Sequence, residues 1–516
     1  MHEGMGDADG ALSPGARRLV FGGLMLALTL PAFDLLILST AGKDIVDDIG
    51  GEIIWMFIAY QITLVATMPL YGKLGDLYGR KRTFQAAIVL FVLASMIAGV
   101  ATTPLTLVIG RALQGIAGGG IIGQAQAVLA DIVPPRERGR VAWVSPTVWS
   151  VASMIGPFIG GFFVDHLTWR WVFFINGPAG LLAFVLIGVA FNVPSARVNH
   201  RLDLLGALLM VGAVALLSFA VSTGGESYAW TSPVIMLSLI LGAVLSVLFF
   251  VQEQRALEPV FPFHLLRDRI VAVCTANAFC IGAANFGVAV FLPLFLRVVV
   301  GVSATEAGLS LLPMSLAITL ASTVVGRRIT RTGRYRWYPI VGTTLFAAGI
   351  YLLATLDQNS TRLDVWTFTA IAGFGSGIAS PVLMLAMQNA VGHEDVGVVS
   401  SLAMFSRTIG QVFGPAIGGT LMAARFEQHV RRFVDRDTFE TLDTKQLRTE
   451  TKTIDDLAEP VRGQVVHAFR IAVNDAFRFA ALVSALGIVI AAFMRTRPLR
   501  QTIIDREPAH SVSAIE

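Results

Sequence analysis

Apolar runs of about twenty residues recur along nearly the whole chain, separated by short turns rich in glycine, proline and arginine. A helix of that length crosses the hydrocarbon of a bilayer, and it satisfies its own backbone groups where no water can do so. The alternating pattern of an outer-membrane β-barrel does not occur in the sequence. The pattern therefore predicts an all-α integral membrane protein.

The apolar runs predict fourteen transmembrane helices. They cover residues 18–40, 54–71, 82–101, 105–130, 140–164, 171–192, 203–221, 232–252, 270–297, 304–325, 337–356, 365–391, 397–422 and 474–494. An even number of spans places both termini on the same side of the membrane.

Composition and charge support this interpretation. Of the 516 residues, 54% are hydrophobic, and the mean hydropathy of +0.69 exceeds that of ordinary soluble domains. With both termini in the cytoplasm, the inner turns and tails carry 23 Lys and Arg, whereas the short outer turns carry four. The outer loop 425–470 adds nine basic residues, balanced by nine acidic ones. This positive-inside bias predicts a multi-pass protein of the inner (cytoplasmic) membrane, and explains the net charge of +4 without a nucleic-acid partner.

An internal repeat divides the chain. GKLGDLYGRKR (Gly72–Arg82) and GRRITRTGRYR (Gly326–Arg336) share glycine at the first and eighth positions and arginine at the ninth and eleventh. GPFIGG (Gly156–Gly161) returns at a similar offset as GPAIGG (Gly414–Gly419). Two copies of a six-helix unit with two linker helices between them explain both pairs. The predicted parts are a cytoplasmic tail 1–16, a first bundle 17–196, the linker helices 197–264, a second bundle 265–496 and a cytoplasmic tail 497–516.

Several motifs together resemble one transporter family. GKLGDLYGRKR, RALQG (Arg111–Gly115), SMIGPFIGG (Ser153–Gly161) and DIVPPRERGR (Asp131–Arg140), with Asp34 in the first span, are similar to the fourteen-helix drug:proton antiporters of the major facilitator superfamily. The resemblance covers residues 17–495. It implies the major facilitator fold and proton-coupled multidrug efflux. The chain departs from the family after Asp34, where it lacks the usual proline and carries Lys43.

The first motif is a candidate gating latch. Gly72, Gly75 and Gly79 allow two helices to turn back tightly and to pack closely. Asp76 can pair with Arg80 and face the positive N-terminus of a neighbouring helix. The resemblance implies a latch between the halves that is closed when the cavity faces outward. The second copy has Thr330 in place of Asp76, so only one latch would be charged; the alternative is that the basic turn merely fixes topology.

Asp34 and Arg111 are candidates for proton coupling. Each lies about 10–12 Å from the outer end of its predicted span, so the two side chains can approach each other. An acid inside a span is functional by default. A carboxylate balanced between burial and a neighbouring cation can bind and release a proton, and a cationic substrate can compete with that proton for the same charge. A static Asp–Arg brace is the alternative, and Gln114, one turn from Arg111, can hold the guanidinium.

The remaining candidates concern helix packing and the substrate cavity. Gly156, Pro157, Gly160 and Gly161 form the motif associated with antiporters; they favour a close, bent helix contact that suits rocking halves, with generic packing as the alternative. Polar and aromatic residues inside spans can line a mixed cavity or simply pack against neighbours. They are Tyr60, Gln61, Gln114, Trp149, Asn277, Asn285, Gln388 and Arg407.

These features predict a transporter and not an enzyme. The sequence has no phosphate-binding loop of the ATP-driven type and no metal-ligand spacing, so we predict no cofactor and no metal. We expect a monomeric, proton-driven exporter of amphipathic or cationic drugs, with protons, small molecules and the lipid bilayer as its partners. An exporter of an endogenous lipid or metabolite, and a non-transporting scaffold or sensor, are the alternatives.

Overall fold

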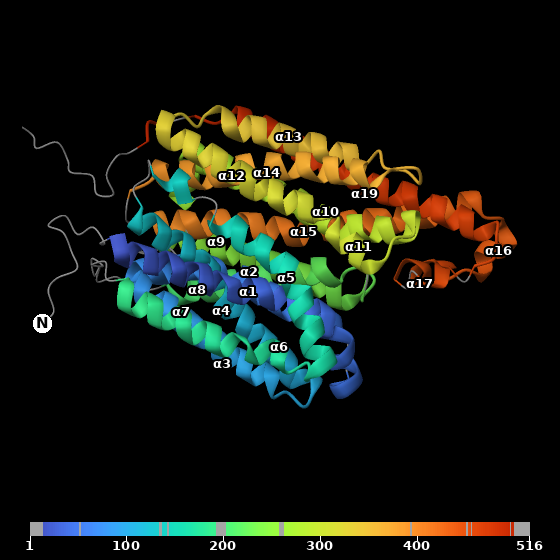
Figure 1. The fold of residues 1–516 in the computed structure, drawn as a ribbon, viewed down its shortest axis with the longest axis horizontal. Coiled ribbons are helices and arrows are strands. Elements are labelled where there is room, and N and C mark those ends of the chain that lie inside the picture. The colour runs from blue at the N-terminus through green and yellow to red at the C-terminus, as the bar shows by residue number, and fades with distance from the viewer. Residues whose placement is uncertain are drawn as a thin grey trace, which may run out of the picture.

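The computed structural model describes residues 14–50, 53–133, 137–141, 144–191, 203–225, 227–256, 263–392, 395–449, 452–455, 457–495 and 497–499. In these ranges the regular structure is helical, apart from one isolated bridge between Gly224 and Tyr228. Most of the long helices run along the long axis of the molecule (Figure 1). The all-α prediction is confirmed for this part of the chain.

The first half contains the helices α1 (Pro14–Ile49), α2 (Ile53–Tyr78), α3 (Arg80–Gly99), α4 (Pro104–Ile132), α5 (Val144–His166), α6 (Trp171–Phe174) and α7 (Asn176–Ala190), with the short 3₁₀ turn η1 (Arg138–Val141) before α5. Two linker helices follow, α8 (Leu204–Thr223) and α9 (Pro233–Arg255). Side chains in the turns start several of these helices: Thr103 caps α4 and Ser232 caps α9, each directly before a proline.

The second half repeats this plan. It contains η2 (Phe263–Arg267), α10 (Arg269–Phe295) with the π-turn η3 (Leu296–Val300), α11 (Ala304–Leu309), α12 (Leu312–Thr332), α13 (Trp337–Leu353), α14 (Arg362–Ala390), α15 (Val396–Phe433) and α19 (Val461–Ala492). The short helices α16 (Arg436–Thr441), α17 (Thr444–Thr449) and α18 (Lys452–Asp455) connect the last two long ones.

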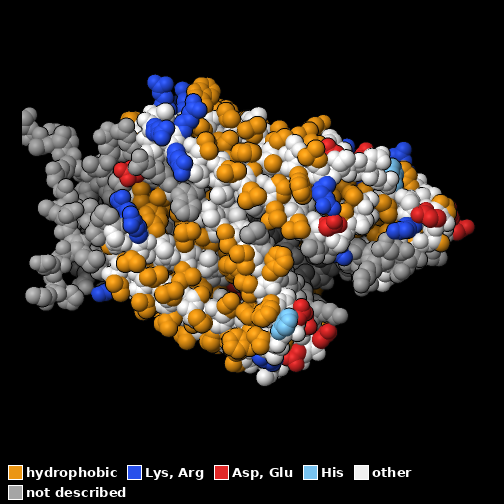
Figure 2. All heavy atoms as spheres, in the orientation of Figure 1, with side chains coloured by type: hydrophobic (Ala, Val, Ile, Leu, Met, Phe, Trp, Pro, Cys, Tyr) orange, Lys and Arg blue, Asp and Glu red, His pale blue; other side chains and the backbone are white. Residues whose placement is uncertain are grey.

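Each half has its own hydrophobic core. One cluster joins buried side chains from α1 to α7, and a second joins those of α10 to α19. Val412 of α15 is buried in the cluster of the first half, so α15 lies at the seam between the halves. On the face in Figure 2, hydrophobic side chains cover the middle of the molecule and most charged ones lie toward its ends, as a bilayer requires.

Eleven segments of the described chain are long and apolar enough to cross a membrane. The helices α2, α5 and α13 lie between them in the bundle, so a helix corresponds to each of the fourteen predicted spans. The number that cross the membrane stays a prediction. In the first half, two helix ends differ most from the prediction: α1 continues to Ile49 instead of ending near residue 40, and α2 continues through the predicted turn to Tyr78.

The predicted outer loop 425–470 is largely helical, which corrects the prediction. The helices α15 and α19 extend into it from both sides, and together they protrude at one end of the molecule (Figure 1). Phe426 and Val430 pack with Val465 and Phe469, and the two phenylalanine rings meet edge to face at 5.5 Å. Apolar residues are few in this segment, but their spacing of four gives each helix a buried face.

The linker helix α8 packs against both halves, on α2 and on α15. Trp55 of α2 stacks on Phe219 of α8 at 5.9 Å, and Gly225, just after α8, lies against Thr420 of α15. α9 packs mainly on α8 and leaves most of its apolar surface exposed. The linker pair therefore covers the seam between α2 and α15.

Candidate functional site

Asp34 and Arg111 form an ion pair inside the first half. Nη1 of Arg111 donates to Oδ2 of Asp34, and both side chains are fully buried. Gln114 joins them as the sequence predicted: its Oε1 accepts from Arg111 Nη1 at 2.9 Å, and its Nε2 donates to Asp34 Oδ1 at 2.9 Å. The three side chains form a closed ring of charge-assisted hydrogen bonds between α1 and α4.

Two further residues complete this network, and the sequence analysis missed both. Asn176 of α7 donates to Asp34 Oδ1 at 3.5 Å and to Ser95 Oγ at 3.2 Å, while Gln114 also donates to Ser95 at 2.7 Å. Ser95 lies on α3, so side chains from α1, α3, α4 and α7 meet in one network around Asp34. Single Ser and Asn residues in apolar segments carry no pattern that would have identified them.

Arg111 also contacts α2. Its Nε donates to the carbonyl of Met56 at 3.3 Å, and its guanidinium lies 4.4 Å from the centre of the Tyr60 ring. A glycine face allows this approach, because a Cβ on Gly115 would overlap the carbonyl of Tyr60. Tyr60 was a cavity candidate; the structure places its ring under Arg111, and its buried hydroxyl has no hydrogen-bond partner in the part of the chain that the structure describes.

The arrangement can couple a proton to helix packing. Protonation of Asp34 would remove the charge that holds Arg111, and an unpaired buried cation costs about 3–5 kcal/mol. Among the described residues, no acceptor bonds to Arg111 Nη2, which leaves one donor of the guanidinium available to another acceptor. The proton-coupling role of Asp34 and Arg111 stays a prediction, and this geometry permits it.

The candidate latch lies where α2 turns into α3. Gly79, with φ of 91°, makes the turn, whereas Gly72 is inside α2, where a Cβ would meet Ser401 of α15. Of the two roles predicted for these glycines, Gly79 makes the turn, whereas Gly72 allows close packing of α2 on α15. Arg80 Nη2 donates to Asp76 Oδ1 at 3.1 Å.

Arg80 anchors the latch to α4. Its Nη1 pairs with Asp131 Oδ1 and donates to the carbonyl of Ala127 at 2.8 Å. Asp76 faces the other half, because a Cβ on Gly397 would overlap its carboxylate. Gly397 is the second residue of α15, so a negative charge lies at the positive end of that helix.

A second contact between the halves lies nearby, and the sequence analysis did not identify it. Arg138 of η1 caps the end of α4, donating to the carbonyls of Ala130 at 2.7 Å and Val133 at 3.1 Å. Its Nη1 donates to Oε1 of Gln388 on α14 at 3.1 Å, and Gln388 in turn donates to Ser400 Oγ of α15 at 2.8 Å. Gln388 was predicted to line the cavity; its hydrogen bonds instead place it in this contact.

The other cavity candidates divide into three groups. Asn277 is fully buried and donates to the carbonyl of Gly487 at 2.7 Å, so it ties α10 to α19 and is not a cavity residue. Trp149, near the start of α5, is 38% exposed. Gln61, Asn285 and Arg407 are part-buried, and each lacks a hydrogen-bond or ion-pair partner among the described residues.

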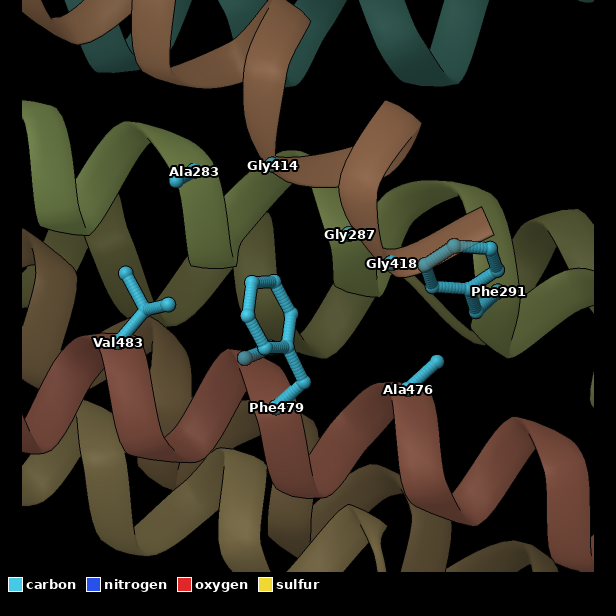
Figure 3. A pocket seen from close by; sticks show the side chains of 9 residues that line it. Ala283, Gly287, Phe291, Gly414, Gly418, Ala476, Phe479 and Val483 are labelled. Atoms are coloured by element: carbon cyan, nitrogen blue, oxygen red, sulfur yellow. The ribbon is translucent and has the colours of Figure 1, made fainter. Parts of the chain in front are cut away.

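Small residues mark the close helix contacts in both halves. On α15, a Cβ at Gly410 or Gly414 would overlap the backbone of α10. On α5, Gly156 and Gly160 are buried and Gly161 meets open space, while the side chain of Pro157 lies outside the described residues. Figure 3 shows a small apolar crevice where α10, α15 and α19 meet, with Gly414 and Gly418 facing Phe291 and Phe479.

Comparison with known proteins gives a consistent result. The family model of the Major Facilitator Superfamily matches residues 21–415. The multidrug transporter protein MdtP of Bacillus subtilis is 36% identical over 411 residues, which cover 79% of this chain and 76% of that protein. An uncharacterized MFS-type transporter of Mycobacterium tuberculosis is 33% identical over 495 residues, or 95% of this chain and 71% of that one.

Among solved structures, the human organic anion transporter MFSD10 superimposes with a TM-score of 0.59 at 14% identity, over 93% of this chain and 100% of that one. A proton:xylose symporter, XylE, superimposes with a TM-score of 0.56 at 12% identity, over 92% of this chain and 95% of that one. At these identities the likeness concerns the fold alone.

Proposed function

Because the chain belongs to the major facilitator superfamily and is therefore a multi-pass membrane transporter and not an enzyme, we propose that it is a proton-coupled antiporter that exports amphipathic drugs. The names of its relatives support drug export: besides MdtP, the multidrug resistance protein 3 of Bacillus subtilis is 33% identical over 78% of this chain. Proton coupling and antiport rest on the site geometry.

The observation that carries the proposal is the buried ring of Asp34, Arg111 and Gln114. A buried ion pair contributes little to stability, because removing two charges from water is costly. A neutral residue could therefore hold α1, α3, α4 and α7 together as well as the titratable Asp34 does. Asp34 adds a site whose protonation changes helix alignment. Each charge moved through 100 mV supplies about 2.3 kcal/mol, enough to drive a substrate gradient of tenfold or more.

In this proposal, gating uses two of the polar contacts between the halves. In the proposed topology, Asp76 at the start of α15 and Arg138 on Gln388 both close the cytoplasmic side. Opening that side requires both contacts to break, and closing it requires α14 and α15 to return to the first half. The structure then corresponds to a state whose cytoplasmic side is closed.

The remaining parts of the proposal follow the charge distribution. The transporter lies in the inner membrane as a monomer, with both termini in the cytoplasm and the hairpin of α15 and α19 outside.

The structure gives little support for a cationic substrate that binds to Asp34. This side chain is 1% exposed and already bonded to Arg111, Gln114 and Asn176.

Everted membrane vesicles test this function. Vesicles containing the protein should accumulate members of a panel of amphipathic drugs when respiration acidifies the lumen. A protonophore should abolish the uptake, and Asp34→Asn should do so without loss of protein from the membrane. Uptake that survives the protonophore, or that needs ATP instead, would contradict the proposal.

A further inference from the structure

Arg407 is a cation that neither the proton network nor the latches use. It lies eleven residues after the start of α15 at Val396, about 17 Å along the helix and near the middle of a bilayer about 30 Å thick. Its side chain is part-buried, and its Nε is enclosed without a hydrogen-bond partner. Within the described residues, nothing forms an ion pair or a hydrogen bond with this guanidinium.

No acid of the neighbouring helices lies at this depth. α15 packs against α2, α4, α8, α10, α14 and α19. In α8 and α10 there is no acidic residue, and the acids of the other four are Asp76, Asp131, Asp364 and Asp475. The first three lie at helix ends, and Asp475 pairs with Arg478 at 2.9 Å in the protruding hairpin.

The surroundings of Arg407 are apolar and close to the seam. Its carbonyl touches Gly282 of α10, so the backbone is fixed against the second half. On α15, Met404 and Phe405 pack onto the core of the first half, as do other residues up to Phe413. The guanidinium therefore projects from a helix that contacts both halves, with apolar and aromatic side chains within one turn.

An unpaired cation in such a place needs an anion. Burying a charge without a partner is costly, and ionisable residues inside membrane helices are retained for function. Arg111, the other arginine at depth in a span, pairs with the carboxylate of Asp34, whereas no described carboxylate pairs with Arg407. A guanidinium presents a planar fork of donors that suits carboxylate, sulfonate and phosphate groups.

We propose that Arg407 binds the anionic group of an amphipathic substrate, so that the exported compounds include organic anions. Gln411, one turn further on α15, is also part-buried without a described partner and supplies a second donor on the same face. This assignment rests on the proposed export function and specifies its substrate class. The sequence predicted amphipathic or cationic substrates, whereas this assignment predicts amphipathic substrates that carry a negative charge.

Binding to the purified protein tests the assignment. We would use 1-pyrenebutyrate and 1-pyrenebutylamine, which share one apolar body and carry opposite charges, with the protein in phosphatidylcholine nanodiscs. Energy transfer from tryptophan to pyrene reports binding, and empty nanodiscs give the background. The wild type should bind the carboxylate more tightly than the amine, and Arg407→Gln should weaken carboxylate binding by about tenfold or more. Arg407→Lys should retain part of the affinity, because it keeps the charge without the fork.

A second variant distinguishes a specific loss of carboxylate binding from a loss caused by misfolding. Gln411→Glu places a carboxylate one turn from Arg407, where it can pair with the guanidinium and displace the ligand. It should also lose the carboxylate probe while keeping the amine probe, and both variants should elute and unfold like the wild type. If folded Arg407→Gln binds pyrenebutyrate within about twofold of the wild type, or loses both probes equally, the assignment is wrong.

Transport in proteoliposomes separates this assignment from the export proposal. If neither probe moves under a proton gradient but carboxylate binding still depends on Arg407, the anion site stands and proton-driven export fails for these probes. If pyrenebutyrate is transported equally by wild type and Arg407→Gln, export stands and the anion site fails.

Discussion

Removing the Gln388 side chain should loosen the proposed cytoplasmic closure while leaving the first half intact. Within the second half it also removes the hydrogen bond of 2.8 Å from Gln388 to Ser400. Gln388 is 5% exposed and joins α14 to Arg138 of the first half through one hydrogen bond of 3.1 Å. Arg138 keeps its bonds to the carbonyls of Ala130 and Val133 when Gln388 is replaced by alanine. The substitution therefore removes the contact between the halves and leaves the cap of α4 in place.

The expected size follows from the type of bond. A hydrogen bond with a charged partner contributes about 1.5–3 kcal/mol, which corresponds to a shift of about ten- to 150-fold in an equilibrium. We expect the lower end for Gln388→Ala, because Asp76 still holds the start of α15. Gln388→Glu should shift the equilibrium the other way, since it converts the same contact into an ion pair with Arg138.

Distances between spin labels on the two halves would measure the shift. Exposed positions such as Tyr78 and Trp337 accept labels after the buried Cys274 and Cys280 are replaced by serine. Gln388→Ala should enlarge the population with a long distance, and Gln388→Glu should reduce it.

Gln85→Ala is the matched control. It removes a hydrogen bond of 3.2 Å from Gln85 to the carbonyl of Phe184, which lies within the first half. If Gln388→Ala and Gln85→Ala give the same distance distribution as the parent protein, the contact of Arg138 with Gln388 does not gate the transporter.

Three further predictions test other parts of the account. Asp76→Asn should leave the protein in the membrane but favour inward-facing states and lower transport; unchanged labelling of cysteines in the outer cavity would leave only a topological role for the turn. Protease added to spheroplasts should cut within residues 434–460, and protection there combined with cutting in inverted vesicles would reverse the topology. Gly414→Ala should destabilise the protein by about 1–3 kcal/mol, because its Cβ overlaps the carbonyl of Ala283, whereas Gly419→Ala, which meets open space, should change little. Thermal unfolding in detergent compares the two, and equal stability would refute the packing argument.

The network around Asp34 and Arg111 could be predicted in part, because charged residues are conspicuous in apolar segments. Asp34 and Arg111 stand out because ionisable residues inside spans are rare, and their equal depth indicated a pair. Ser95 and Asn176 could not be inferred, since which small polar residues converge depends on how four helices are rotated against one another. Gln388 and Asn277 show the same limit: a polar residue inside a span can face a cavity or bond to a neighbouring helix, and spacing alone does not distinguish these.

Helix boundaries were harder to predict where charge and packing conflict. The outer ends of α15 and α19 are rich in charged residues, which resembles a loop in composition. The apolar residues at positions 426, 430, 465 and 469 nevertheless pair two helices beyond the predicted membrane boundary. The sequence predicted that Asp76 faces the N-terminus of some neighbouring helix. It could not identify that helix as α15, because the sequence does not show which helix approaches the turn.

Proton release from the purified transporter tests the central claim most directly. When an exported compound is added to wild-type protein in a weakly buffered solution containing a pH indicator, the account predicts that protons appear in the medium. Asp34→Asn keeps the size of the side chain but cannot titrate, so release should vanish while the protein still binds the compound and unfolds at the same temperature. Release from Asp34→Asn equal to that of the wild type would mean that another group carries the proton and that Asp34 is a structural brace for Arg111.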